Sequence, residues 1–413
     1  MSRPAISPRI SELRRHVEAG DTTAAESFWR RLTREGTPLL EEEEGDREHL
    51  LLTLVFRAEE PVRGVVVVPG LESIWQPEHN RLVPVPGTSL WHRTWRVRRD
   101  LRTTYCFSPD EPLRALHEMS AEEETRYLEE RMKVWRPDAL NPRRFSPHPS
   151  LPPMSVIELP EAPGRHWTVR RPDVPRGRLD EGVYQDARSG RERTFWLYRP
   201  ASGSVAEDAP LLVLCDGAGH LELGVTDVLD NLIAGRHIPP LVCVLLHHSD
   251  RNVELPCNDA FVEEVAAELL PLVRSELRLR AAPARTVMGG WSFGGLAAAY
   301  AGLRHPEVFG NVLSQSGSFW WAPGGAEEHE WLTGQFARAP RSGVRFHLNV
   351  GLLERGPSPG NSPSQLVANR HLRDVLRAKG HEVIYRELNG GHDYLGWMAG
   401  LADGLMSLLG REV

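Results

Sequence analysis

The most constraining feature of this chain is a regular alternation of strand-like and helix-like patterns through residues 194–409. Short apolar runs typical of buried strands occur near residues 194–199, 211–215, 241–246, 286–289, 312–315, 344–350 and 383–388. Helical patterns lie between several of them, at residues 259–278, 293–304, 365–379 and 394–409. Such alternation predicts a mostly parallel sheet covered by helices on both faces, which is an α/β fold.

The first part of the chain has a different character. A chain of 413 residues exceeds the usual size of one hydrophobic core, so two domains are expected. Residues 7–35 have a helical pattern, with Asp21 as a candidate cap. Apolar and alternating runs then predict strands at residues 49–56, 64–68, 90–97 and 103–107. We therefore predict an immunoglobulin-like β-sandwich within residues 1–150 and the α/β domain within 151–413, joined by a proline-rich linker at 136–164.

The sequence Gly-Trp-Ser-Phe-Gly at residues 290–294 is the main catalytic candidate. It follows the predicted strand at 286–289 and precedes the predicted helix at 293–304. A serine on such a strand-to-helix turn is exposed above the sheet, and the arrangement is typical of a nucleophile elbow. We therefore predict Ser292 as the nucleophile. The alternative is a glycine-rich turn whose serine only caps the helix.

A serine nucleophile needs a base and an orienting acid, which follow it in the chain in this class of site. His392 comes after the predicted strand at 383–388 and a short Asn-Gly-Gly turn, so it is the candidate base. Glu354 lies just past the predicted strand at 344–350 and is the candidate acid. Asp374 and Asp393 are weaker candidates, and a serine–histidine pair without an acid stays open.

An oxyanion hole requires two hydrogen-bond donors. The residue after the nucleophile, Phe293, supplies one backbone N–H in this type of site. The second donor is expected in the turn after the strand at 211–215, from Gly217 or Ala218. An ordinary tight turn is the alternative interpretation of this glycine-containing segment.

The composition limits which kinds of partner and which cellular compartment are expected for this protein. The net charge of −7 and the lack of a basic block argue against nucleic-acid binding. The sequence contains no run of 18 apolar residues, so no membrane span is expected. The first residues also lack the apolar stretch of a signal peptide. The four cysteines form no C-x-x-C pair, which favours a reducing, cytoplasmic setting. No cluster with metal-ligand spacing is evident, so no protein metal site is expected. The oligomeric state stays open.

Several separated segments resemble one family, the enterochelin (ferric enterobactin) esterases. Besides the serine motif, they are PGTSLW at 86–91, LRTTYCF at 101–107, LNP at 140–142, VLDNLIA at 228–234, ELPCN at 254–258, SQSGSFWW at 314–321 and NGGHD at 389–393. The resemblance covers roughly residues 45–410. It implies an immunoglobulin-like domain followed by an α/β-hydrolase domain. It also implies a cytoplasmic serine esterase that cuts the ester bonds of a ferric catecholate siderophore, with Ser292, His392 and Glu354 as a catalytic triad.

The implied substrate makes electrostatic demands on this acidic chain. Iron(III) bound by three catecholates carries three negative charges, so a local cationic patch is expected to attract it. Arg251 and Arg355 are the candidate cations. Trp291, Trp320 and Trp321 are candidates for packing on catechol rings, although a core role is equally consistent. Iron belongs to the substrate, and no separate cofactor is expected.

Two other functions remain compatible with the sequence. The same scaffold suits a general carboxylester or feruloyl-type esterase, which would cut simple aryl esters instead of a trilactone. A non-catalytic ligand-binding protein is the third reading, with Trp75, Trp91 and Trp95 as a sugar-binding platform on the sandwich.

Overall fold

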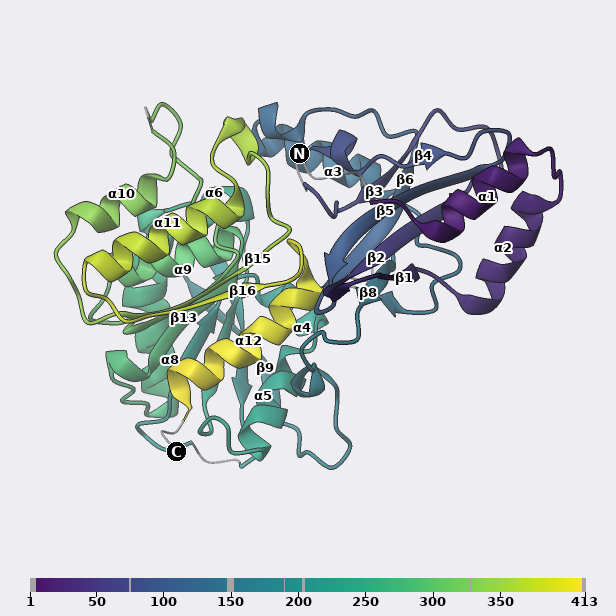
Figure 1. Ribbon diagram of the computed structural model, residues 1–413. Helices are drawn as coiled ribbons and strands as arrows, with labels where there is room; N and C mark the ends of the chain where they lie inside the picture. Colours follow the sequence, from purple (N-terminus) through teal and green to yellow (C-terminus); the bar gives the residue numbers. More distant parts are fainter. Residues whose placement is uncertain are drawn as a thin grey trace. The chain divides into compact units, whose positions relative to one another are not determined.

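The computed structural model describes residues 5–73, 76–146, 152–188, 190–202, 205–326 and 328–410 (Figure 1). It divides into two compact units. The first unit consists of Met1–Gly164 with two later segments, Leu352–Gly360 and Asn389–Leu395. The second unit consists of Arg165–Gly351, Asn361–Leu388 and Gly396–Val413.

The first unit is a β-sandwich, as predicted. One sheet has the strand order β1-β2-β5-β4, with bounds Leu39–Glu43, Asp46–Arg57, Leu90–Arg98 and Val83–Pro84. The other has the order β3-β6-β8-β7, with bounds Val65–Val68, Arg102–Pro109, Met154–Glu158 and Arg144–Phe145. All pairings within both sheets are antiparallel.

Strand β2 explains how the sandwich is covered on two sides. Leu50, Leu52 and Leu54 alternate along the strand and lie in the core shared with residues of the second sheet, such as Tyr105. Val55 points the other way and packs in a cluster with residues of two helices, α1 (Pro8–Glu18) and α2 (Ala24–Glu35). The nearly continuous apolar run in β2 therefore reflects burial on both faces.

The N-terminal helical pattern forms the two helices α1 and α2. The chain leaves α1 at Gly20, which has φ +86°, and α2 begins at Ala24. Asp21 stabilises the connection, because its Oδ1 accepts hydrogen bonds of 2.8 Å from both the backbone N–H and the hydroxyl of Thr23. Asp21 therefore orders the turn before α2, and Thr23 occupies the N-cap position.

The domain boundary lies later than predicted. The segment interpreted as a linker contributes β7 and β8 to the sandwich, and β8 pairs with β6 from Arg102 to Tyr105. The first continuous part of the first unit therefore ends at Gly164 instead of residue 150. Its prolines obscured two short strands, of which β8 buries Ile157 in the sandwich core.

Two loops from the C-terminal half complete the first unit. Leu353 is buried in the sandwich core, and its N–H donates to Gly390 O at 3.0 Å. The second loop is joined to β6 by a hydrogen bond of 2.9 Å from Arg102 N–H to Asn389 O. The Thr103 hydroxyl also donates to Asp393 Oδ2 at 2.7 Å. Both loops are thus anchored on the sandwich by apolar and polar contacts.

The second unit contains an eight-stranded sheet. Its order is β16-β15-β14-β13-β11-β12-β10-β9, with bounds Val383–Leu388, Arg345–Gly351, Asn311–Gln315, Thr286–Trp291, Leu211–Leu214, Val242–Leu246, Glu192–Arg199 and Arg178–Gln185. The six strands from β16 to β12 are parallel, while β10 and β9 are antiparallel. The predicted α/β fold is confirmed.

Helices cover both faces of this sheet, and a separate hydrophobic core lies on each face. One core contains residues of α7 (Asp259–Glu264), α8 (Leu270–Leu277), α9 (Phe293–Arg304), α10 (Trp331–Arg338) and α11 (Gln365–Ala378). The other contains residues of α5 (Val225–Ala234) and α12 (Tyr394–Leu409). Alternate residues of β11 divide between them, because Leu211 and Val213 belong to the first core and Leu212 and Leu214 to the second.

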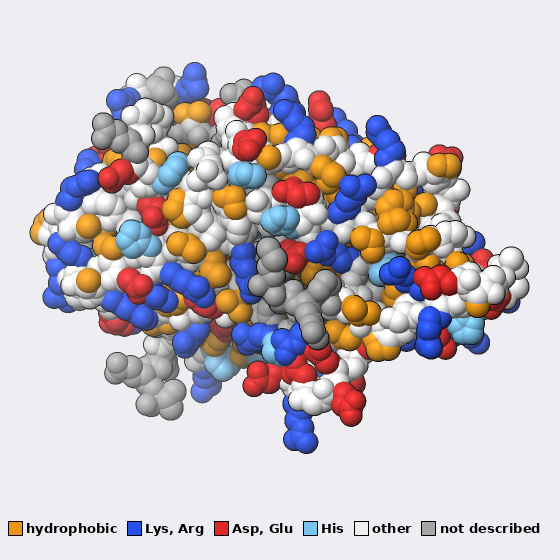
Figure 2. Space-filling view, turned by 45° about the horizontal axis from the view of Figure 1, so that its top comes forward, with side chains coloured by type: hydrophobic (Ala, Val, Ile, Leu, Met, Phe, Trp, Pro, Cys, Tyr) orange, Lys and Arg blue, Asp and Glu red, His pale blue; other side chains and the backbone are white. Residues whose placement is uncertain are grey.

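Strand β9 was not predicted from the sequence. It is an edge strand, and exposed positions alternate with half-buried ones along its length. Its residues therefore lack the apolar run that identified the central strands. Within the described ranges, none of the helices combines the length and apolar character needed to cross a membrane. Figure 2 shows basic side chains interspersed with acidic ones over the face in view.

Candidate functional site

Ser292 occupies a strained turn between β13 and α9. Its backbone has φ 53° and ψ −121°, a region that residues with a side chain seldom adopt. The turn is so tight that a Cβ at Gly290 would lie 2.7 Å from the carbonyl carbon of Gly294, so this position requires glycine. Its geometry agrees with the elbow predicted from the sequence, including the strand before it and the helix after it.

The strained conformation is fixed by contacts with the strand beside it. Ser292 N–H donates to Gln315 O at 2.9 Å, and Ser292 O accepts from Ser318 N–H at 3.1 Å. The two hydroxyl oxygens of Ser292 and Ser318 are 3.3 Å apart. Ser318 lies just after β14, so the segment following this strand holds the nucleophile candidate at both its backbone and its side chain.

Glu354 and His392 meet in the first unit, on the two loops described above. Glu354 Oε2 lies 2.6 Å from His392 Nδ1, and the Glu354 side chain is fully buried. An ionised carboxylate only accepts hydrogen bonds, so this contact places the imidazole proton on Nδ1. A neutral ring then carries its lone pair on Nε2, which is the tautomer a general base requires.

The competing acids have other partners. Asp393 accepts the Thr103 hydroxyl, as described, and Asp374 forms an exposed ion pair with Arg373. The structure therefore brings the predicted base together with Glu354 among the three acidic candidates. Ser292 belongs to the second unit, and its pairing with His392 stays a prediction.

The two predicted oxyanion donors lie in the first turns of helices. Phe293 is the first residue of α9, and Gly217 and Ala218 begin α4 (Gly217–Glu222). The segment at 217 is thus a helix start instead of the predicted simple turn. The first N–H groups of a helix lack carbonyl partners within it, so they are suited to an oxyanion. Strands β11 and β13, which precede these helices, are direct neighbours in the sheet.

Glycine at position 217 is required by packing. A Cβ there would lie 2.8 Å from both the carbonyl carbon of Leu245 and the carbonyl oxygen of Leu246. The preceding residue, Asp216, has a left-handed conformation with φ 57° and ψ 43°. The start of α4 therefore rests directly on the end of β12, and this contact sets the direction of its N–H groups.

Asp216 is the centre of a polar network that sequence reasoning missed. Arg251 binds its carboxylate with both Nε and an Nη, at 2.6 and 3.0 Å. The backbone N–H of Asp216 donates to His248 Nε2 at 2.9 Å. His248 Nδ1 lies 3.4 Å from Glu254, which also forms a close ion pair with Arg193. Both the side chain and the backbone of Asp216 are thus held by the segment that follows β12.

The charges of this network shift two acidic groups. Burial acts to raise the pKa of Asp216, but the charge and hydrogen bonds of Arg251 outweigh it and leave the pKa below its usual value. Burial likewise opposes ionisation of Glu254, while His248 and Arg193 lower its pKa to about 2. Both carboxylates are therefore charged at neutral pH, and each needs its cation.

Removing the cation beside Asp216 should weaken the fold around the oxyanion donors. We expect Arg251→Gln to lower the free energy of unfolding by about 1–3 kcal/mol at pH 7, because a buried carboxylate loses its partner. Without Arg251 burial should raise the Asp216 pKa, so the deficit should shrink as the pH falls from 7 towards 4 and the carboxyl takes up a proton. Urea unfolding of both proteins at several pH values measures this.

A double variant provides the control for this prediction. Arg251→Gln combined with Asp216→Asn removes both charges and retains a residue type that tolerates the left-handed conformation. This protein should regain part of the lost stability. Equal stability of Arg251→Gln and wild type across the pH range would show that the ion pair contributes nothing.

The predicted substrate contacts have different outcomes. Arg251 binds Asp216, and its guanidinium also lies 5.8 Å from the centre of the Phe293 ring. Arg355 is exposed, with its Nε donating to Leu352 O at 2.6 Å. Contacts of these two arginines with substrate stay predictions. Trp321 is half-buried against Trp331 and also remains a candidate.

Trp291 and Trp320 are buried, which agrees with the core role left open for them, and their contact with substrate stays a prediction. Trp291 is 4% exposed and stacks on Trp397 at 5.4 Å between ring centres, with His220 on it at 3.8 Å. Trp320 is 8% exposed and packs near the Phe293 ring. Their positions in the sequence did not reveal whether their rings are buried or exposed.

The sugar platform considered for the sandwich is also not supported. Trp95 is buried in the sandwich core, and Trp91 is half-buried against the same cluster. Trp75 lies outside the described residues. In the part of the chain that the structure describes, His, Cys, Asp and Glu form no group of three or more able to hold a metal ion.

Comparisons with known proteins agree with this architecture. Two family models match, "Enterochelin esterase, N-terminal" over residues 51–168 and "Putative esterase" over residues 187–408. An iron(III) enterobactin esterase of Escherichia coli O6:H1 (strain CFT073) is 34% identical over 338 residues, covering 78% of this chain and 80% of that protein.

Solved structures of a relative from Shigella flexneri extend over nearly the whole fold. Its enterobactin esterase, crystallised in the presence of enterobactin, matches with a TM-score of 0.69 and 31% identity, covering 93% of this chain and 97% of that chain. The same enzyme in the presence of 2,3-di-hydroxy-N-benzoyl-serine gives 0.68 and 30%, covering 93% and 98%.

Proposed function

Because the chain belongs to the enterochelin esterase family, we propose that it hydrolyses the ester bonds of a catecholate trilactone siderophore of the enterobactin type. Family membership makes it a carboxylic ester hydrolase. The substrate is inferred from the relatives, which are named iron(III) enterobactin esterase. Cutting the trilactone would separate the three catecholate arms and so weaken their joint hold on iron, which enters as cargo of the substrate.

The observation that carries the proposal is the backbone of Ser292. A non-glycine residue at φ 53° and ψ −121° costs of the order of 1–3 kcal/mol, and such strain persists where the surroundings enforce it. Here Gln315 and Ser318 bind its backbone on both sides. A residue that merely caps α9 needs none of this strain, because helix caps ordinarily have extended backbones. The strain therefore favours a nucleophile over a cap.

In the proposed mechanism Ser292, His392 and Glu354 act as a triad. Each follows a strand of the same sheet, since Ser292 follows β13, Glu354 comes three residues after β15, and His392 comes four residues after β16. Ligands and catalytic groups of open α/β sheets gather at the carboxyl ends of such strands. His392 Nε2 takes the Ser292 proton as the hydroxyl attacks the ester carbonyl, while Glu354 stabilises the imidazolium.

Backbone N–H groups of Phe293 and of Gly217 or Ala218 then bind the oxyanion of the tetrahedral intermediate. Loss of one such donor typically costs about 3 kcal/mol in the barrier. The serine hydroxyl of the substrate leaves with the proton from His392, and water attacks the acyl-enzyme with the same histidine as base. The Arg251–Asp216 pair and His248 hold the second donor in place throughout.

A cytoplasmic location is part of the proposal. All four cysteines are free thiols, and Cys106, Cys215 and Cys243 are buried. Such thiols suit a reducing compartment. The exposed Arg355, next to the acid in the chain, supports a local attraction for an anionic substrate on a protein of net charge −7.

Product analysis tests the reaction directly. Purified protein is incubated with the cyclic trilactone of 2,3-dihydroxybenzoyl-serine, iron-free and iron-loaded, and the products are followed by mass spectrometry. We expect masses increased by one water per ester bond cut, together with shorter linear fragments. Turnover of p-nitrophenyl esters with no change in either trilactone would favour a general esterase instead.

Loss of the Glu354 carboxylate should reduce kcat by as much as loss of the acid does in other catalytic triads. We expect Glu354→Gln to reduce kcat by a factor of about 10⁴, because an amide disfavours the Nδ1–H tautomer of the histidine. Glu354→Asp, which keeps the charge, should recover part of the loss. Initial rates on the trilactone measure both. If Glu354→Gln kept more than a tenth of the wild-type kcat, the Glu354 carboxylate would not be required for His392 to act as the base.

A further inference from the structure

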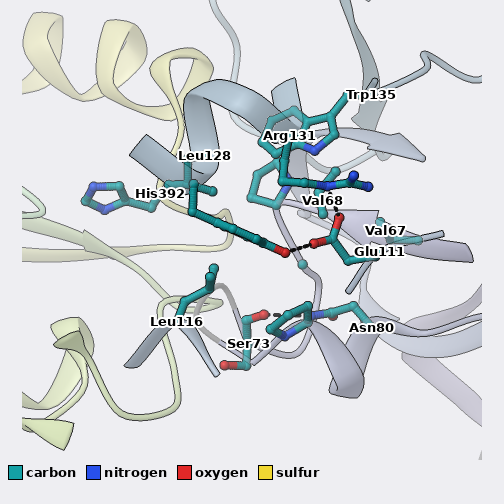
Figure 3. Close-up of a pocket in the computed structure, with 14 residues that line it drawn as sticks. Val67, Val68, Ser73, Asn80, Glu111, Leu116, Leu128, Arg131, Trp135 and His392 are labelled. Carbon is teal, nitrogen blue, oxygen red and sulfur yellow. Dashed lines mark hydrogen bonds and ion pairs between the residues drawn. The ribbon is translucent and has the colours of Figure 1, made fainter. Parts of the chain in front are cut away.

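A pocket in the first unit has no role in the proposed mechanism (Figure 3). It lies among β3, η1 (Pro77–Asn80), η2 (Leu116–Glu118) and α3 (Ala121–Met132), and its volume is about 150 Å³. Its walls are mostly apolar, with Val67, Leu116 and Leu128 among the lining residues. Pockets of this kind, apolar with a few polar groups, are typical small-molecule sites.

One wall of the pocket is a neutral set of paired charges. Glu111 accepts hydrogen bonds from Tyr127 and from Arg131 Nε, the latter at 3.1 Å, and its side chain is 3% exposed. Arg131 also donates to Ser108 Oγ and Pro109 O. Burial and the adjacent Glu111 raise the pKa of Tyr127, so its phenol stays protonated. This wall therefore presents an aromatic ring and a fixed network without net charge.

Two other lining groups have unused hydrogen-bonding capacity. Ser73 is 2% exposed, and its Oγ has no hydrogen-bond partner within the described part of the chain. The same holds, among the residues the structure describes, for the buried Nε1 of Trp135. Buried polar atoms are ordinarily paired, and an unpaired one indicates a missing ligand or water. The Ser73 hydroxyl therefore indicates a ligand with a polar group at its end of the pocket, and Trp135 lies at the opposite end (Figure 3).

The pocket borders the proposed catalytic base. His392 is one of its lining residues, and Figure 3 shows it at the margin of the pocket with the imidazole directed away from the other labelled side chains. The loop after Glu354 also packs here, since a Cβ at Gly356 would lie 2.5 Å from Ser73 Oγ. A ligand in the pocket would thus lie next to the loops that carry the acid and the base.

We propose that this pocket binds one metal-free catechol ring of a siderophore arm, which makes the N-terminal sandwich part of the substrate-binding surface. The proposal rests on the proposed function for the identity of the arm. A cavity of about 150 Å³ in another protein binds benzene, so this pocket has room for a single ring. An iron ion holding three such rings does not fit, and the neutral wall offers its three negative charges no attraction.

The chemistry of a catechol matches the pocket. The ring face packs on Leu116, Leu128 and the Tyr127 ring. One of its hydroxyl groups exchanges hydrogen bonds with Ser73 Oγ. The amide that links the ring to the rest of the arm then extends towards His392. In this position the arm directs its ester bond to the base.

Isothermal titration calorimetry with 2,3-dihydroxybenzamide tests the pocket without any turnover. We expect saturable one-to-one binding to the full-length protein, and weaker binding of benzamide, which lacks both hydroxyls. Ser73→Ala should weaken 2,3-dihydroxybenzamide binding by about two- to tenfold, as expected for one hydrogen bond, whereas Trp135→Phe, at the opposite end of the pocket, should change it little. The gallium(III) complex of three such ligands should not compete.

Filling the pocket provides the sharper variant. Leu128→Trp places a large ring into the space, and it should abolish binding of 2,3-dihydroxybenzamide. Glu130→Trp, on an exposed position of the same helix, is the matched control and should bind like wild type. Leu128→Trp that binds like wild type would overturn the proposal, as would a wild-type protein that binds neither amide. Thermal unfolding checks that each variant is folded.

The same variants separate this inference from the proposed function. Leu128→Trp should raise KM for the iron-free trilactone, whereas the control Glu130→Trp should leave this KM unchanged. If the trilactone is not a substrate but dihydroxybenzamide binding depends on Leu128, the proposed function fails and the pocket stands. If the trilactone is cut equally by both proteins, the pocket fails and the proposed function stands.

Discussion

Replacement of Ser292 by alanine is expected to reduce kcat by a factor of about 10⁶, as found when a triad nucleophile is removed elsewhere. The Ser292 hydroxyl is the proposed attacking group, and the described site offers Ser318 Oγ, 3.3 Å away, as its nearest hydroxyl neighbour. Substrate binding should persist, because the hydroxyl contributes little area. The measurements are steady-state rates and calorimetry with the uncut trilactone.

The strain at this position gives the experiment a second readout. Ser292→Gly should be as inactive as Ser292→Ala, yet it should have a higher thermal unfolding midpoint. Glycine relieves strain of about 1–3 kcal/mol at φ 53° and loses about 0.4–1 kcal/mol through a more flexible unfolded chain. Ser275→Ala, on an exposed face of α8, is the matched control and should change neither activity nor stability. Residual turnover by Ser292→Ala at wild-type levels would remove Ser292 from the mechanism.

Replacement of His392 by alanine should greatly lower the reactivity of the Ser292 hydroxyl, which is still present in this variant. We expect the rate at which a fluorophosphonate labels Ser292 to fall by about 10²–10⁴, the range of a lost general base. The label is read by mass spectrometry of the peptide that contains residue 292, so it reports directly on cooperation between Ser292 and His392.

An exposed histidine controls for the loss of an imidazole as such. His371→Ala, on the surface of α11, should be labelled at the wild-type rate. Unchanged labelling of His392→Ala would mean that another group activates Ser292, and the triad would have to be reassigned. A reduced rate in both variants would instead indicate a general loss of structure.

The central strands and the serine turn were predictable because their signals are local. Apolar runs such as Leu211–Leu214 mark strands buried on both faces, and a serine between a strand and a helix defines its own geometry. The contact of Glu354 with His392 followed from chain order and strand ends, without any local signal for the contact itself. By contrast, β9 at the sheet edge carries too little apolar pattern to be recognised.

Other features depend on contacts that a local pattern does not encode. Trp291 lies in the serine motif and Trp320 in the segment after β14, but only the packing of α12 and α9 shows that their rings are enclosed. The Arg251–Asp216 pair joins residues 35 positions apart. Nothing in the loop sequences at 352–360 and 389–395 indicated that they pack on the sandwich, since this depends on surfaces formed by distant segments.

The two loops at 352–360 and 389–395 tie the folding of the first unit to the end of its synthesis. The sandwich unit remains incomplete until residue 395 has left the ribosome, because Leu353 belongs to its core and Asp393 binds Thr103. A gene fragment that begins after residue 164 would encode the serine turn, the acid and the base. It would lack the β-sandwich on which the loops of the acid and the base pack. The two halves of this chain are therefore poor candidates for exchange between proteins as independent modules.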